Sequence, residues 1–145
     1  MSNQAIINNT YLSDKELDHF KNLLIEEKQS AEKEISILQT SIDQIENKMN
    51  DTSSSAAHHQ GNVGSNEELR QTNYTLIEKQ KDKLEKIAMA LDRIETGNYG
   101  ICLATGKQIQ KERLEAIPYT MHAFESKQGN LEPDSKEQLS VNETN

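Results

Sequence analysis

The sequence is poor in the residues that build thick cores or covalent cross-links. Its 145 residues include one cysteine, two prolines, two phenylalanines and no tryptophan, and aromatic residues make up 4%. A single cysteine excludes an internal disulfide bond. Because burial must outweigh the loss of chain entropy, so few large apolar side chains argue against a thick globular core. We expect long helices that share one narrow apolar seam.

Basic charge and long apolar runs are also scarce. The chain has 16 Lys and Arg residues against 24 Asp and Glu residues, which gives a formal net charge of -8 at pH 7. This balance argues against sequence-specific DNA binding, which needs clustered basic side chains, and against an anionic membrane surface. No stretch approaches the roughly 20 apolar residues of a transmembrane helix, and the N-terminus lacks a signal-peptide pattern. We therefore expect a cytoplasmic protein.

The first long pattern with helical spacing starts near the N-terminus. Ser13 and Glu16 form a capping box, which is typical of a helix start. Apolar residues then recur in steps of three and four, with one step of seven. They are Leu17, Phe20, Leu24, Ala31, Ile35, Leu38, Ile42, Ile45 and Met49. This heptad seam predicts one long helix with a single apolar stripe.

A second helix is expected between Ser65, which suits an N-cap, and Gly97, which suits the position after a C-terminus. Its stripe consists of Leu69, Leu76, Leu84, Ile87, Leu91 and Ile94, with the polar Asn73 and Gln80 on the same face. In an antiparallel hairpin the numbers of facing residues have a nearly constant sum, and pairs such as Ile42 with Leu76 satisfy this. The predicted fold class is mainly α, a long antiparallel two-helix coiled-coil hairpin. Two helices of an ordinary bundle are the alternative.

After Gly97 the pattern changes to YGICLATGKQI, in which apolar residues alternate around two glycines. Such a segment predicts a short β-like turn structure. RLEAIP follows, and then YTMHAFESKQ, for which we expect a short helix.

This region resembles the C-terminal part of the DksA/TraR family of bacterial transcription factors. The family signature combines a helix that ends in R-I-E-x-G-x-Y-G-x-C with a later R-L-E-A-x-P. The matching residues are Arg93, Ile94, Glu95, Gly97, Tyr99, Gly100, Cys102, Gly106, Ile109, Arg113, Leu114, Glu115, Ala116 and Pro118. The resemblance covers roughly residues 12–128 and implies a hairpin that carries a small zinc-finger-like globular subdomain.

The zinc site departs from the family pattern of two C-x-x-C pairs. Cys102 occupies the first ligand position, but Thr105, Ala123 and Ser126 occupy the other three. A structural zinc ion needs four Cys or His ligands. We therefore expect a degenerate zinc finger without zinc, in which packing and the hydroxyls of Thr105 and Ser126 replace the metal. A weak metal site from Cys102 and His122 is the alternative.

The predicted organisation has four parts. They are a flexible N-terminal arm at 1–10, the hairpin at 11–97 with its tip loop at about 51–66, the zinc-finger-like subdomain at 98–128 and a disordered tail at 129–145. The tail is assigned from its polar, acidic composition.

The resemblance also implies a function. Family members bind RNA polymerase core directly and insert their coiled coil into its secondary channel, typically together with ppGpp, the nucleotide of the stringent response. The chain would then be a monomeric transcription regulator and not an enzyme, and we find no paired catalytic carboxylates, nucleophile with base, or phosphate loop. A structural or adaptor coiled coil that self-associates, or docks another partner without acting on polymerase, is the alternative.

Two sets of residues follow from the resemblance. The tip of active relatives carries D-x-x-D-x-A, and here the matching positions hold His59, Asn62 and Gly64, which form either an altered polymerase-facing tip or a plain connecting loop. Lys86 and Lys127 match positions that contact ppGpp in responsive relatives, and they are either such contacts or solvated lysines. A third such position, an arginine in relatives, holds an isoleucine here.

Overall fold

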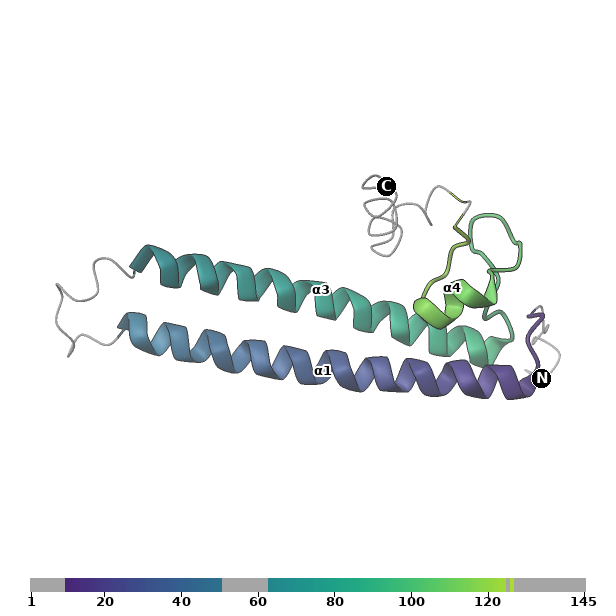
Figure 1. Cartoon of the computed structure of the whole chain (residues 1–145), viewed down its shortest axis with the longest axis horizontal. Coiled ribbons are helices and arrows are strands. Elements are labelled where there is room, and N and C mark those ends of the chain that lie inside the picture. Colours follow the sequence, from purple (N-terminus) through teal and green to yellow (C-terminus); the bar gives the residue numbers. More distant parts are fainter. Residues whose placement is uncertain (1–9, 51–62, 125, 127–145) are drawn as a thin grey trace. The chain divides into compact units, whose positions relative to one another are not determined.

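The computed structural model describes residues 10–50, 63–124 and 126 (Figure 1). The described residues form three helices in the order α1 (Asp14–Asn50), α3 (Val63–Thr96) and α4 (Lys111–Ala116). The described residues form no β-strand, and one isolated antiparallel bridge joins Ile101 to Gln108. The mainly α prediction is confirmed. Within the described ranges, no helix combines the length and apolar character that crossing a membrane requires.

The chain divides into two compact units, and both long helices contribute to each. The terminal unit comprises Met1–Glu27 and Glu85–Asn145, and the central unit comprises Lys28–Leu84. In each unit α1 and α3 lie side by side in opposite directions, as the hairpin prediction requires (Figure 1). Residues 63–66 of the expected tip loop are the first residues of α3. The predicted domain boundaries otherwise stay predictions.

The ends of the helices follow local sequence signals. At the start of α1, the N–H of Ser13 donates to Glu16 Oε1 at 3.0 Å and the N–H of Glu16 donates to Ser13 Oγ at 3.1 Å, which confirms the capping box. After α3, Gly97 has φ 82°, and the N–H of Asn98 donates back to the Arg93 carbonyl at 2.8 Å. This is the expected glycine stop. Ser65, expected as the N-cap, lies inside α3.

The terminal unit has the larger core. Helix residues Phe20, Leu24, Ile87 and Ala90 are buried, as are subdomain residues Tyr99, Cys102, Ile109, Leu114, Ile117, Met121 and Ala123. The Phe20 and Tyr99 rings meet with their centroids 5.8 Å apart. The Tyr99 hydroxyl donates to the Pro118 carbonyl at 2.7 Å. The subdomain therefore packs onto the helices through apolar side chains, and this hydrogen bond joins two of its segments.

The central unit corrects the predicted stripe of α3. Leu69 is 49% exposed and Leu76 is 37% exposed, whereas Ile77 is only 3% exposed and packs with Leu38 and Ile42. The reason is helical phase. Counting back from Leu84 in alternating steps of four and three reaches positions 80, 77, 73 and 70, so both leucines fall one residue off the seam. On α1 the predicted stripe holds, although Met49 is 37% exposed.

The short helix also lies elsewhere than expected. It is α4, in KERLEA, whereas Tyr119–Phe124 is not helical. The carbonyl of Met121 accepts from the N–H of Leu103 at 2.8 Å, and the carbonyl of His122 accepts from Arg113 Nε at 2.9 Å. These carbonyls therefore bond to remote donors instead of to the next helical turn.

Candidate functional site

The four positions that correspond to zinc ligands come together in the terminal unit. Cys102 opens a turn in which the N–H of Gly106 donates to the Cys102 carbonyl at 2.8 Å. Gly106 has φ 74°, which the turn requires and which glycine adopts without strain. In the second turn, the N–H and the hydroxyl of Ser126 both donate to the Ala123 carbonyl, at 3.0 and 2.9 Å. The turns thus keep the frame of a two-knuckle finger.

The Cys102 sulfur lies among hydrogen-bond donors. Burial raises the pKa of this thiol, but hydrogen bonds from the Thr105 hydroxyl and from the N–H groups of Ala123, Thr105 and Ala104 outweigh burial and lower the pKa from 9.0 to about 6. Donors that stabilise an anion act in this direction. In the family pattern four thiolates hold a zinc ion. In this chain a single thiolate, that of Cys102, accepts hydrogen bonds from a hydroxyl and from backbone N–H groups.

Arg93 and His122 lie near the same turns. Arg93 Nη2 donates to the carbonyls of Asn98 and Ile101. Burial lowers the pKa of Arg93, and the charge of Cys102 acts in the opposite direction. His122 Nδ1 is buried and has no hydrogen-bond partner. In the part of the chain that the structure describes, no three His, Cys, Asp or Glu side chains form a group that could hold a metal ion.

Two polar side-chain pairs connect the subdomain to α1. Glu115 Oε2 lies 2.6 Å from His19 Nε2. Lys111 Nζ lies 2.5 Å from Glu16 Oε2, and this contact lowers the pKa of Glu16 and raises that of Lys111. Both pairs are half-exposed, and they orient the subdomain more than they stabilise it.

The other predicted site residues stay predictions. His59, Asn62 and Lys127 lie outside the described residues, and Gly64 lies in the first turn of α3. Lys86 is half-buried on α3 in the terminal unit.

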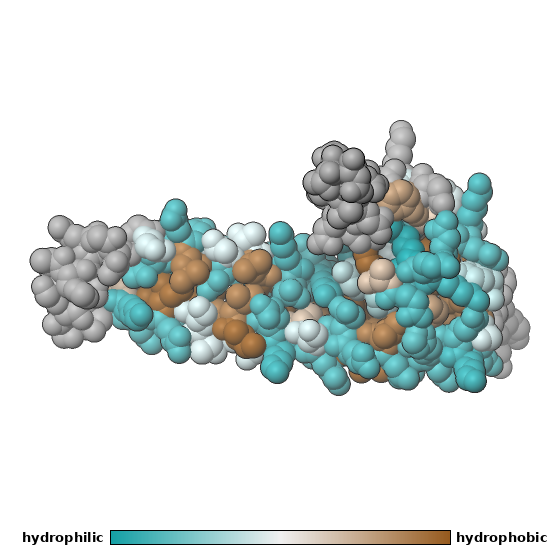
Figure 2. Space-filling model, viewed as in Figure 1, coloured by the Kyte–Doolittle hydropathy of each residue, from teal (hydrophilic) through white to brown (hydrophobic). Residues whose placement is uncertain are grey.

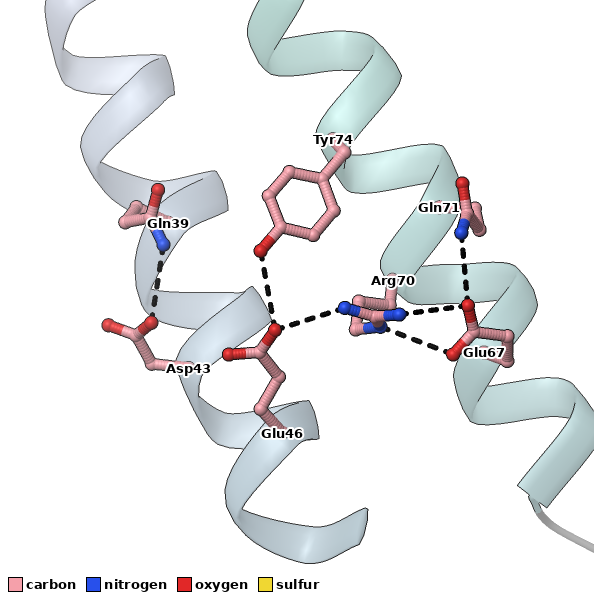
Figure 3. Close-up of polar contacts among 7 residues, drawn as sticks. All are labelled: Gln39, Asp43, Glu46, Glu67, Arg70, Gln71 and Tyr74. Carbon is pink, nitrogen blue, oxygen red and sulfur yellow. Dashed lines mark hydrogen bonds and ion pairs between the residues drawn. The ribbon is translucent and has the colours of Figure 1, made fainter. Parts of the chain in front are cut away.

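Sequence analysis missed a polar network in the central unit. Arg70 of α3 contacts Glu46 of α1 and Glu67 of its own helix, and Tyr74 also reaches Glu46 (Figure 3). The spacing of Glu67 and Arg70, three residues apart on one helix, was the available signal. Nothing in the sequence placed Glu46 beside them.

The fold and the two turns define the class of protein, a helical hairpin that carries a small finger-like subdomain. Comparisons with known proteins agree. The chain is 31% identical over 103 residues to General stress protein 16O of Bacillus subtilis, which is 71% of this chain and 63% of that relative. It is 29% identical over 118 residues to the RNA polymerase-binding transcription factor DksA of Caulobacter vibrioides, covering 81% of this chain and 78% of that protein.

A solved structure extends the comparison to the fold. Transcription factor DksA2 from Pseudomonas aeruginosa matches with a TM-score of 0.66 and 27% identity, over 93% of this chain and 91% of the other. No model of a protein family matches the chain. With the R-I-E-x-G-x-Y-G-x-C and R-L-E-A-x-P residues in register, the chain is a DksA/TraR-like family member.

Proposed function

We propose that the chain is a transcription regulator that binds RNA polymerase core directly, with its hairpin in the secondary channel. The observation that carries this proposal is the likeness in fold to DksA2 over 93% of the chain. The two long helices are retained although the cysteine pattern of the finger is not. The net charge of -8 suits a basic pore through which nucleotides pass.

The proposal also covers the metal, the self-association and the activities that we expect this chain to lack. The subdomain needs no zinc, because hydrogen-bond donors around Cys102 stabilise its turns and the packing of Tyr99 against Phe20 holds it on the helices. The protein acts in the cytoplasm as a monomer, reads no DNA sequence and catalyses no reaction. These features are those of a factor that acts on polymerase through contact alone.

The tip and the nucleotide response differ from those of active relatives. His59 and Asn62 stand where carboxylates stand in the family pattern, so the tip acts through hydrogen bonds instead of negative charge near the polymerase metal site. Lys86 and Lys127 contribute to ppGpp binding, but Ile117 stands where relatives have arginine. Loss of a forked guanidinium weakens a phosphate site, so we propose a weak ppGpp response.

A competition experiment tests the main proposal. The full chain carries a fluorophore, and its binding to the cognate RNA polymerase core is measured with and without an unlabelled factor known to occupy the secondary channel. We expect saturable binding that the competitor abolishes. An acidic coiled coil of equal length and charge serves as control. Absence of binding by a protein of native size and helicity would overturn the proposal.

An adaptor coiled coil is the second candidate, and exposed leucines favour it. Leu69 and Leu76 lie seven residues apart on α3 and face solvent, and Ile37 of α1 is 54% exposed. Figure 2 shows hydrophobic residues at the surface of the central unit. Light scattering at micromolar concentration separates the candidates. A dimer that dissociates when both leucines are changed to Gln would favour the adaptor.

A further inference from the structure

Different kinds of contact hold α1 and α3 together at different points along the central unit. One apolar cluster, formed by Leu38, Ile42 and Ile77, packs the helices together. Closer to residues 51–62, α1 still buries Ile45, but α3 presents polar residues to its partner. They are Asn73, whose Nδ2 donates to Ser41 Oγ at 2.9 Å, and Arg70. Beyond the apolar cluster, polar contacts from Asn73, Arg70 and Tyr74 therefore join α3 to α1.

Arg70 is the centre of these contacts (Figure 3). Its Nε and Nη2 donate to the two oxygens of Glu67, at 3.2 and 2.9 Å, and its Nη1 donates to Glu46 Oε2 on α1 at 3.1 Å. The Tyr74 hydroxyl donates to the same Glu46 oxygen at 3.3 Å, and the guanidinium carbon lies 5.7 Å from the Tyr74 ring centre. Gln71 donates to Glu67 at 3.0 Å. The hydrogen bonds from Arg70, Tyr74 and Gln71 thus restrict the positions of the Glu46 and Glu67 carboxylates.

The geometry favours orientation over stability. The paired contact with Glu67 fixes the plane of the guanidinium from within α3, and the remaining Nη1 points at Glu46 of α1. The Arg70 and Glu46 side chains are 27% and 38% exposed, and partly exposed ion pairs stabilise a fold only slightly. The Arg70 guanidinium, held in one orientation by Glu67, instead favours one distance between α1 and α3 and one rotation of each helix about its axis.

We propose that Arg70 is a positioning residue that sets the separation of α1 and α3 near Asn50 and Val63, where the two helices end and begin. Its use in the docking of the hairpin on RNA polymerase rests on the proposed function. Arg70 acts through Glu46 and Glu67 and needs no contact with the polymerase itself.

Distance measurement between spin labels tests the positioning directly. Labels replace the exposed Lys48 and Thr72 through cysteine substitutions in the full chain, with Cys102→Ser in every sample. We expect Arg70→Gln to widen the distance distribution at least twofold. The double exchange Glu46→Arg with Arg70→Glu should restore the narrow distribution, because the guanidinium then reaches the carboxylates from the other helix. A separate label pair at Lys21 and Asp92 reports the terminal unit and should not change.

Lys79→Gln is the matched control, since it removes one positive charge from an exposed position of α3 in the same unit. Circular dichroism checks that every variant keeps its helices. An unchanged distribution in Arg70→Gln, or a double exchange that stays as wide as the single variant, overturns the proposal. Binding to RNA polymerase core is measured in parallel and should weaken at least threefold in Arg70→Gln and recover in the exchange. If the unaltered chain does not bind, the proposed function fails while the distance result still decides the role of Arg70.

Discussion

The Thr105 hydroxyl donates a hydrogen bond to the Cys102 sulfur, and both residues stand at positions where the family pattern has zinc-binding cysteines. In the family pattern the residues at these two positions are connected through a metal ion, whereas in this chain the two side chains contact each other directly. The second turn contributes in the same way through the N–H of Ala123. The turns can keep their shape because a buried sulfur anion accepts several hydrogen bonds at once.

Stability should depend on pH through Cys102. The folded pKa of about 6 lies below the ordinary 9.0, so between these values the unfolded chain holds a proton that the folded chain has released. The free energy of unfolding therefore rises with pH across this range, is fully gained above the unfolded pKa and is lost as pH falls through the folded one. Urea unfolding of the full chain and of Cys102→Ser at several pH values checks this, because other titrations cancel in the difference. Parallel curves would contradict the assignment.

The Thr105 hydroxyl can be removed while the backbone N–H donors to the Cys102 sulfur stay in place. Thr105→Val keeps the side-chain shape but loses the hydroxyl, so the pKa of Cys102 should rise, whereas Thr105→Ser should leave it nearly unchanged. Thiolate absorbance followed over a pH titration measures both. Equal pKa values in the two variants would show that the backbone N–H groups alone hold the thiolate.

Three substitutions should rebuild a zinc site. Thr105→Cys, Ala123→Cys and Ser126→Cys together with Cys102 give four thiolates at positions that the turns already bring together, and four thiolates bind zinc tetrahedrally. We expect the triple variant to bind one Zn²⁺ and to show a tetrahedral cobalt spectrum, while the unaltered chain binds neither and keeps its melting temperature in a chelator. Stoichiometric zinc in the unaltered chain would refute the proposed metal-free finger.

Two glycines in left-handed conformation offer a matched pair. A Cβ at Gly100, with φ +88°, would lie 3.2 Å from Leu12 Cδ1, whereas a Cβ at Gly106, with φ +74°, meets nothing within 4 Å. Gly106→Ala should cost about 1 kcal/mol from backbone strain, and Gly100→Ala at least about 1 kcal/mol more from overpacking. Urea unfolding of both variants measures the difference. Equal losses would mean that Leu12 moves aside freely.

The contact of Phe20 with Tyr99 should decide whether the subdomain stays on the helices. Phe20 is buried, and Phe20→Ala should cost about 3–5 kcal/mol. Tyr99→Phe leaves the Pro118 carbonyl without its donor and should cost about 1–3 kcal/mol. Leu103→Ala, at an exposed position, is the control and should change stability by less than about 0.5 kcal/mol. Hydrogen exchange would show where protection is lost, and a loss confined to the central unit would contradict this account.

Local sequence signals determined the start of α1, the end of α3 and the apolar stripe of α1. The capping box of Ser13, the stop at Gly97 and the apolar steps from Leu17 to Ile45 depend on residues within one or two turns of each other. The four finger positions could be found from a motif, because the spacing of Cys102 and Thr105 is fixed along the chain. These features need no knowledge of remote partners.

Only the tertiary structure decided which residues meet across the fold. Ile77 and not Leu76 faces α1, because a helix is rigid in phase and the buried residues farther along α3 set its rotation. Glu115 pairs with His19, and the carbonyls of Met121 and His122 bond to remote donors instead of continuing a helix. The low pKa of Cys102 likewise depends on Ala123, which lies 21 positions away in the sequence. Such partners are chosen by packing in space, and periodicity along the chain does not contain them.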